Sequence, residues 1–272
     1  MKKILSVLLT IVVILTVSGC GTKKEVPATA KVVPDKKTIK VGASPMPHSE
    51  ILEVVKPLLA KAGYTLEIVE FTDYVTPNTA LAEGQIDANF FQHVPYLQTF
   101  SKEKNLDLDY TVKVHIEPMG VYSSKYKSLN NLKAGAEIAI PSDPTNGARA
   151  LRVLENAGLL KLKKGDLISV LDITENPKQL KITELDAPQL PRILKDVDAA
   201  VINSNFAIEA NLNPTVDSLA IEAKESPYAN VLAVKSEDKT KPYIEALSKA
   251  LNSPEVKKFI EDKYKGNVIP AF

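Results

Sequence analysis

Residues 141–151, PSDPTNGARAL, place an arginine within the first two turns of a predicted helix. Asp143 can accept backbone N–H groups as the N-cap, and Pro144 suits the first helical position because its missing N–H would be unpaired there. Asn146 and Arg149 lie three residues apart and therefore share one helix face. A cation beside the positive end of a helix is unfavourable unless an anion meets it. Arg149 is therefore either a solvated surface residue or a binding group for a negative charge.

Three aromatic residues and a histidine stand near predicted turns. The segment FTDYVTPN puts Tyr74 directly after a strand, and ANFFQHVPYL puts Phe91, His93 and Tyr96 around a strand-to-helix turn. Each of these residues alone is more often packed in a core than in contact with a ligand. Turns on a rigid sheet are where binding residues gather, so their shared placement, together with Arg149, indicates a binding site.

The sequence lacks the motifs of several enzyme classes. It has no GxSxG nucleophile elbow, no P-loop and no glycine-rich dinucleotide fingerprint. Its three histidines, His48, His93 and His115, are widely spaced and form no HxxxH pair, so a zinc or manganese site would require convergence in three dimensions. We therefore predict no cofactor, no metal and no catalytic residue.

Two series of alternating strands and helices indicate an α/β protein. Strands are predicted at 38–44, 64–71, 109–118, 119–124, 136–140, 167–170, 181–185, 198–204, 218–223 and 228–236, and helices at 49–63, 93–105, 144–157, 187–196, 205–212, 241–253 and 254–266. A short helix followed by a short strand is predicted within 76–91. The pattern favours two lobes, 38–118 plus 231–272 and 119–230, with the ligand in the cleft between them, because open α/β sheets bind ligands at the carboxyl ends of their strands. One continuous doubly wound domain is the alternative.

The first 19 residues are typical of a secretory signal, with two lysines before an apolar run from Ile4 to Val17. The sequence VSGC matches a bacterial lipobox, in which Cys20 is lipidated and becomes the new N-terminus. An unlipidated signal or a plain anchor is the alternative. Residues 20–37 are polar and lysine-rich, which predicts a flexible tether. Cys20 is the only cysteine, so an internal disulfide is impossible.

The charge balance gives no argument for nucleic acid as a partner. The whole chain has a formal net charge of +1, and residues 1–19 contain two lysines and no acidic residue, so the remaining chain has +1 − 2 = −1. A strongly basic charge is the signal that would indicate nucleic-acid binding, and this chain does not have it.

Several segments resemble one known family. They are FTDYVTPNTALAEGQIDANFFQHVPYL, IPSDPTNGARAL, ENPKQLKITELDAPQLPR, AVINSNFA and ESPYANVLAV. With the lipobox they span nearly the whole chain after the signal and resemble the NlpA-type lipoproteins, the MetQ-like methionine-binding proteins of bacterial ABC importers. The resemblance implies a two-lobed α/β fold of the periplasmic-binding-protein type (type 2), which closes on a methionine zwitterion.

The resemblance also implies roles for individual residues. Arg149 is expected to bind the ligand carboxylate, so that the anion comes from the ligand. Polar contacts are implied for Asn146, for Asn205 or Asn203, for Asn230 and, less directly, for Glu117 with the ammonium group. Tyr74, Phe91, His93 and Tyr96 match the pocket around the thioether, where sulfur–aromatic contacts stabilise the ligand. Phe206 stands where the family often has tyrosine, which leaves no hydroxyl at that position.

The implied protein is lipid-anchored on the extracytoplasmic face of the cell membrane. It would capture L-methionine and deliver it to an ABC permease with its ATPase subunit, without being an enzyme. Binding of D-methionine or of a methionine-containing dipeptide is one alternative. An extracellular hydrolase, with Glu117 as base and His93 or His115 as its partner, is an alternative of a different class.

Overall fold

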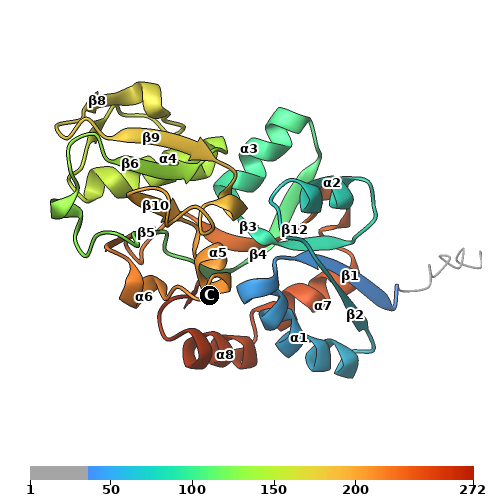
Figure 1. The fold of residues 1–272 in the computed structure, drawn as a ribbon. Coiled ribbons are helices and arrows are strands. Elements are labelled where there is room, and N and C mark those ends of the chain that lie inside the picture. The colour runs from blue at the N-terminus through green and yellow to red at the C-terminus, as the bar shows by residue number, and fades with distance from the viewer. Residues whose placement is uncertain (1–35) are drawn as a thin grey trace, which may run out of the picture. The chain divides into compact units, whose positions relative to one another are not determined.

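The computed structural model describes residues 36–272. The predicted signal peptide, Cys20 and most of the predicted tether therefore lie outside the described residues. The described chain is mixed α/β, with most strands in two separate sheets and with helices packed on them (Figure 1). No helix within residues 36–272 is both long and apolar enough to cross a membrane.

The first sheet has six strands in the order β13-β4-β12-β3-β1-β2. Strand β1 is parallel to β2 and β3, whereas β12 is antiparallel to β3 and β4. The bounds of these strands are β1 Thr38–Ala43, β2 Thr65–Glu70, β3 Ala88–His93, β4 Leu108–Ile116, β12 Ala229–Lys235 and β13 Ile269–Pro270.

Helices cover both faces of this sheet. The side chains of strand β12 belong to two different apolar clusters. Leu232 and Val234 lie in one cluster, and Val231 and Ala233 lie in the other. Alternate side chains of a strand point to opposite faces, so the strand is buried on both sides. The first cluster contains α1 Glu50–Lys61, α7 Pro242–Leu251 and α8 Pro254–Tyr264, and the second contains α2 Thr76–Ala82 and α3 Val94–Lys104.

The second sheet has five strands in the order β11-β5-β10-β6-β9. Strand β6 is parallel to β9 and β10, while β5 is antiparallel to β10 and β11. Helix α4 Pro144–Asn156 packs on one face, and α5 Ser204–Glu209 packs on the other. The other bounds are β5 Gly120–Tyr122, β6 Glu137–Pro141, β9 Lys181–Leu185, β10 Ala199–Ile202, β11 Ala220–Ile221, α6 Pro214–Asp217 and the small hairpin β7 Lys161–Leu162 with β8 Ile173–Glu175.

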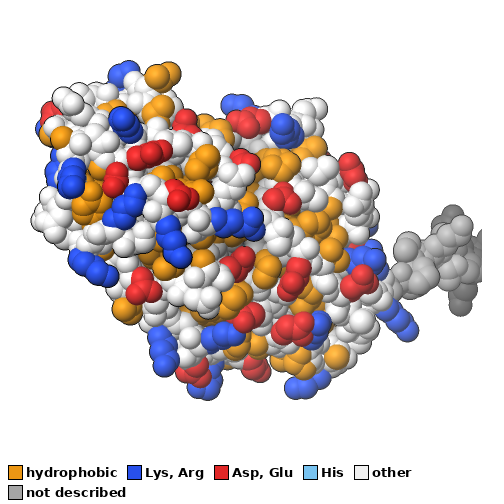
Figure 2. All heavy atoms as spheres, in the orientation of Figure 1, with side chains coloured by type: hydrophobic (Ala, Val, Ile, Leu, Met, Phe, Trp, Pro, Cys, Tyr) orange, Lys and Arg blue, Asp and Glu red, His pale blue; other side chains and the backbone are white. Residues whose placement is uncertain are grey.

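The chain passes between the sheets twice. Residues 117–119 lead from β4 in the first sheet to β5 in the second, and residues 222–228 lead back from β11 to β12. The two separate sheets confirm the prediction of two α/β units rather than one continuous doubly wound sheet. Figure 2 shows acidic and basic side chains interspersed over the face that it presents, in keeping with the nearly neutral charge.

Two predicted elements are wrong. The segment 167–170 is not a strand, because Ser169 and Asp172 cap each other and close a 3-10 turn over Val170–Asp172. The segment 187–196 is not an α-helix and has only the 3-10 turn Ala187–Gln189 followed by turns. Pro188 and Pro191 explain the second error, since Pro191 has no N–H to donate to the preceding turn. The predicted strand 218–223 is reduced to Ala220–Ile221.

Candidate functional site

A cavity of about 340 Å³ is lined by residues from elements of both sheets. The structure brings all ten residues singled out from the sequence to this one cavity. They are Tyr74, Phe91, His93, Tyr96, Glu117, Asn146, Arg149, Asn203, Asn205 and Asn230, and sequence reasoning missed Gln92 and Ser204, which also line it.

Helix α4 begins as the capping pattern predicted. Its first residue is Pro144, and the Asp143 carboxylate accepts the Asn146 N–H at 2.9 Å. The other carboxylate oxygen of Asp143 accepts from the Asn146 side-chain amide, also at 2.9 Å. This cap orients the Asn146 side chain, so that its Oδ1 is the atom left for contacts across the site.

Asn146 joins residues at the ends of strands of both sheets. Its Oδ1 accepts from Asn203 Nδ2 at 2.9 Å and lies 3.0 Å from His93 Nε2. His93 is the N-cap of α3, and its Nδ1 accepts the Tyr96 N–H at 3.1 Å. Because Nδ1 is an acceptor, the ring proton must sit on Nε2, which then donates to Asn146. Burial lowers the pKa of His93 to about 3, with the Arg149 charge acting in the same direction.

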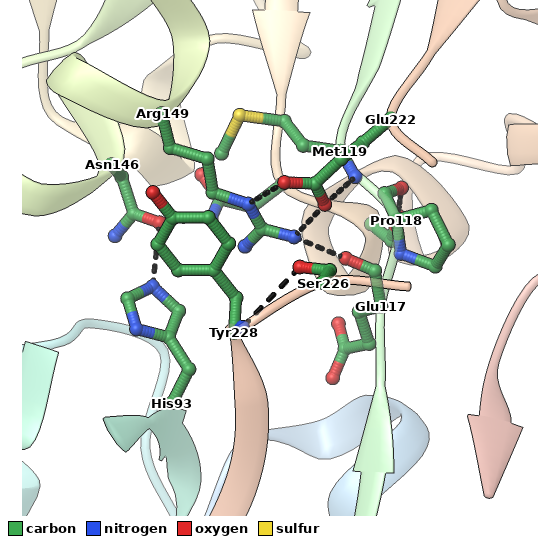
Figure 3. A network of polar contacts seen from close by, with 11 residues as sticks. His93, Glu117, Pro118, Met119, Asn146, Arg149, Glu222, Ser226 and Tyr228 are labelled. Atoms are coloured by element: carbon green, nitrogen blue, oxygen red, sulfur yellow. Dashed lines mark hydrogen bonds and ion pairs between the residues drawn. The ribbon is translucent and has the colours of Figure 1, made fainter. Parts of the chain in front are cut away.

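Arg149 is buried and forms an ion pair with Glu222 (Figure 3). Its Nε donates to one oxygen of Glu222 at 3.0 Å and its Nη2 donates to the other at 2.5 Å. Nη2 also donates to the main-chain oxygen of Glu117 at 2.7 Å, and the guanidinium lies 4.3 Å from the centre of the Tyr228 ring. Arg149 therefore contacts both segments that connect the sheets.

The chain itself supplies one anion for Arg149, the Glu222 carboxylate, and the expected contact of Arg149 with a ligand carboxylate stays a prediction. Sequence reasoning missed Glu222 since it lies 73 residues from Arg149 and carries no motif. The alternative that Arg149 is a solvated surface residue is wrong, since only 3% of its side chain is exposed. Within residues 36–272, Nη1 of Arg149 has no hydrogen-bond partner, and this residue lines the cavity.

Aromatic rings form the apolar part of the cavity wall. Tyr74 lies 5.9 Å from both Phe91 and Tyr96, measured between ring centres, and 5.0 Å from Phe206. The Tyr96 hydroxyl donates to the main-chain oxygen of Tyr74 at 2.8 Å. The Tyr74 hydroxyl donates to Asn205 Oδ1 at 2.6 Å. Each tyrosine hydroxyl is thus satisfied, which leaves ring faces and edges for contact with an apolar group.

Two amide groups in the cavity wall have buried polar atoms without a partner in the described chain. They are Nδ2 of Asn205, a donor, and Oδ1 of Asn203, an acceptor. A buried polar atom without a partner costs about 1–3 kcal/mol. One unpaired donor and one unpaired acceptor, beside the free Nη1 of Arg149, suit a ligand with both an anionic and a cationic end.

Glu117 is buried in contact with two histidines. Its Oε1 lies 2.7 Å from His115 Nε2 and 3.2 Å from His48 Nε2. Burial raises the pKa of the Glu117 carboxyl, while His48 and Arg149 act in the opposite direction. Burial lowers the pKa of His48 to about 4 and that of His115 to about 3. Sequence reasoning did not place His48 at the site and considered His115 only as the partner of a hydrolytic base.

A sequence model of the NlpA lipoproteins matches residues 39–272, almost the whole described chain. The chain belongs to the NlpA lipoprotein family. Its two-sheet α/β fold is that of the periplasmic substrate-binding proteins. A protein of this kind from an ABC transporter of Coxiella burnetii is 46% identical and superposes with a TM-score of 0.83, over 86% of this chain and 100% of that one.

Other NlpA relatives carry names that mention a ligand. The D-methionine-binding lipoprotein MetQ of Salmonella typhi is 38% identical over 263 residues, covering 95% of this chain and 94% of that protein. A nutrient-binding protein from Burkholderia cenocepacia, solved with bound methionine, is 50% identical with a TM-score of 0.84. That similarity covers 86% of this chain and 100% of the Burkholderia chain.

Proposed function

We propose that this protein is the methionine-binding component of an ABC importer and not an enzyme. The observation that carries the proposal is the cavity, which combines an aromatic wall with unpaired groups of opposite kinds, the Asn205 donor and the Asn203 acceptor. Methionine has the matching parts, namely a carboxylate, an ammonium group and a thioether. The 50% identical Burkholderia protein bound to methionine supports the same ligand.

The ligand carboxylate is assigned to the donors of the cavity. These are Nη1 of Arg149, Nδ2 of Asn205 and the side-chain amide of Asn230. The guanidinium keeps its bonds to Glu222 and uses its remaining N–H groups for the ligand. The ammonium group is assigned to the Glu117 carboxylate and to Asn203 Oδ1. Under this assignment both Asn203 and Asn205 contact the ligand.

The thioether is assigned to the aromatic wall of Tyr74, Phe91 and Tyr96, next to His93. Sulfur near an aromatic ring gains about 0.3–1.5 kcal/mol for each contact. Asn146 acts on this part of the site by holding the Nε2–H of His93 and the amide of Asn203 in fixed orientations. The hydrogen bond between His93 of the first sheet and Asn146 of α4 on the second sheet links the two sheets beside the cavity.

The remaining parts of the transport system follow from the family and the sequence. We assign 38–118 plus 231–272 to one lobe and 119–230 to the other, so that the crossings at 117–119 and 222–228 act as the connection between them. We further assign the protein to the extracytoplasmic face of the cell membrane, attached through a lipid on Cys20. Its partners would be the permease and the ATPase subunit of the importer.

Titration with L-methionine tests this function directly. At 100 times its Kd, methionine is expected to raise the free energy of unfolding by about 2.7 kcal/mol, because it binds only the folded protein. Mass spectrometry should recover the amino acid unchanged. Parallel titrations with D-methionine and with a methionine-containing dipeptide show which of the three ligands binds most tightly. A converted product would support a hydrolase, and no binding of any of the three ligands would contradict the proposal.

The anchor is tested separately by Cys20→Ala. Lipidation supplies the membrane attachment in this proposal, so the variant is expected in the soluble fraction after cell disruption, with its methionine affinity unchanged. Membrane fractionation after a high-salt wash provides the measurement. A variant that stays with the membranes would show that another segment anchors the chain.

A further inference from the structure

The Glu117 carboxylate is held by neutral groups from distant parts of the chain. His48 follows β1, and His115 lies near the end of β4. Both rings present Nε2 to the same Oε1 of Glu117, at 3.2 Å and 2.7 Å. His48 Nε2 also lies 3.1 Å from Asn230 Oδ1.

The surroundings of the two imidazoles determine where their protons sit. Nε2 of His48 faces two oxygen atoms, and Nε2 of His115 faces one, so each of these nitrogens acts as a donor. Nδ1 of each ring is buried and has no partner in the part of the chain that the structure describes. A proton on Nδ1 would be a buried unsatisfied donor, which is more costly than an unused lone pair there. The His115 ring is therefore an Nε2–H tautomer that donates to Glu117, while His48 Nε2 hydrogen-bonds to Asn230 Oδ1 and lies 3.2 Å from the same Glu117 oxygen.

The same geometry argues against a resident metal ion. His48, His115 and Glu117 offer ligand atoms within 4.8 Å of one another, a spacing that one ion can bridge. Metal bound at Nε2 would move the ring proton to Nδ1, and metal-binding histidines normally donate that proton to a second group. Nδ1 of His115 has no such acceptor within residues 36–272.

The carboxylate also lacks a cation from the chain. Among the described residues, no lysine or arginine forms an ion pair with Glu117, and Arg149 contacts only its main-chain oxygen. A buried carboxylate is costly unless a positive charge meets it. The cavity that Glu117 lines is the place from which such a charge can arrive.

We infer that His115 is a positioning residue, which together with the adjacent His48 holds the Glu117 carboxylate toward the cavity so that the site selects ligands with a free primary ammonium group. This inference rests on the proposed function and narrows its ligand class. N-acylated methionine and the hydroxy-acid analogue of methionine, which carries a hydroxyl in place of the amine, are excluded as good ligands.

The first test compares two variants of His115 with two ligands. His115→Leu removes the donor, whereas His115→Gln keeps an N–H close to the place of Nε2. Calorimetric titration is expected to show methionine affinity reduced about 10- to 100-fold in His115→Leu, the range for a hydrogen bond to a charged group. The affinity for the hydroxy-acid analogue should fall less than about 3-fold, and His115→Gln should restore most of the methionine affinity. Equal losses for both ligands would overturn the inference, because a general structural defect does not distinguish an amine from a hydroxyl.

The second test determines by NMR which ring nitrogen of each histidine carries the proton. The chain has only three histidines, so NMR of protein labelled with ¹⁵N in histidine gives few ring signals, and His48→Gln and His115→Gln assign them by loss. Neutral Nε2–H tautomers are expected for both residues at pH 7. An Nδ1–H tautomer, a cationic ring or one retained equivalent of zinc would overturn the inference. If the wild type binds no methionine, the proposed function fails, and the tautomer of His115 still decides whether it donates to Glu117.

Discussion

Replacing Arg149 by alanine is expected to lower the free energy of unfolding of the ligand-free protein by about 3–5 kcal/mol. This is the usual cost of removing one member of a buried ion pair, because the other charge stays buried without a partner. The carboxylate left behind belongs to Glu222, of which 12% is exposed. From the sequence alone the opposite result is expected, since removal of a cation from a helix N-terminus relieves repulsion. The free energy lost with the ion pair is larger than the free energy gained by relieving this repulsion.

The same substitution is expected to weaken methionine binding by about 2–5 kcal/mol, or roughly 30-fold to several thousand-fold in Kd. Nη1 of Arg149 is the cationic donor that the proposal assigns to the ligand carboxylate. Methionine amide has no carboxylate, so it should bind the wild type poorly and lose little more in the variant. Calorimetric titration of both ligands into both proteins forms a double-mutant cycle.

A double variant separates the two roles of Arg149. Arg149→Ala combined with Glu222→Ala removes both charges, so most of the lost stability should return while methionine binding stays weak. Denaturant unfolding and calorimetry on the same samples provide both measurements. If the single and double variants are equally unstable, the ion pair is not the source of the stability. If Arg149→Ala binds methionine like the wild type, the assignment of the carboxylate is wrong.

Local patterns were sufficient to predict the residues at strand and helix ends. Asp143 and Pro144 start α4 as their capping preferences require, and Asn146 and Arg149 consequently share the face that lines the cavity. His93 is the last residue of the fully buried strand β3 and the N-cap of α3, which has a proline in its first turn, and this places it at a turn. For these residues the position in the fold follows from the neighbouring sequence.

Contacts between distant segments could not be predicted in the same way. Glu222 and Arg149 meet because Glu222 directly follows β11, an edge strand of the sheet on which α4 packs, and no local pattern encodes that proximity. His48 and Asn230 are separated by 182 residues and meet because β1 and β12 both flank β3. The prediction of a helix at 187–196 was wrong for a local reason. The apolar pattern is that of a helix, but Pro191 cannot donate the hydrogen bond that a helix interior requires.

Lowering the pH from 7.5 to 4.5 is expected to reduce the free energy of unfolding by an amount on the order of 3 kcal/mol. His48, His93 and His115 are buried and neutral, and burial lowers their pKa values from the ordinary 6.5 to about 4, 3 and 3. Between those values and 6.5 the unfolded chain binds more protons than the folded one. The stability that they contribute is therefore complete above pH 6.5 and is lost as the pH falls.

Two carboxyl groups act in the opposite direction and reduce the size of this effect. Burial raises the pKa of Glu209 to about 7, with the Glu117 charge acting in the same direction, and burial also raises the pKa of Glu117. A carboxyl group with a raised pKa favours the folded state as the pH falls. Three histidines with large shifts outweigh these two groups, so the net change is destabilising.

Denaturant unfolding at the two pH values measures the net change in stability. A double variant that lacks two of the three histidines provides the control. In the double variant His48→Gln with His115→Gln, two of the three buried imidazoles no longer titrate while a side-chain amide remains at each place. Its loss of stability between pH 7.5 and 4.5 should therefore be much smaller than that of the wild type, or reversed by the two carboxyl groups. Acid destabilisation as large in this variant as in the wild type would assign the effect to other groups and would contradict the neutral, buried state of these two histidines.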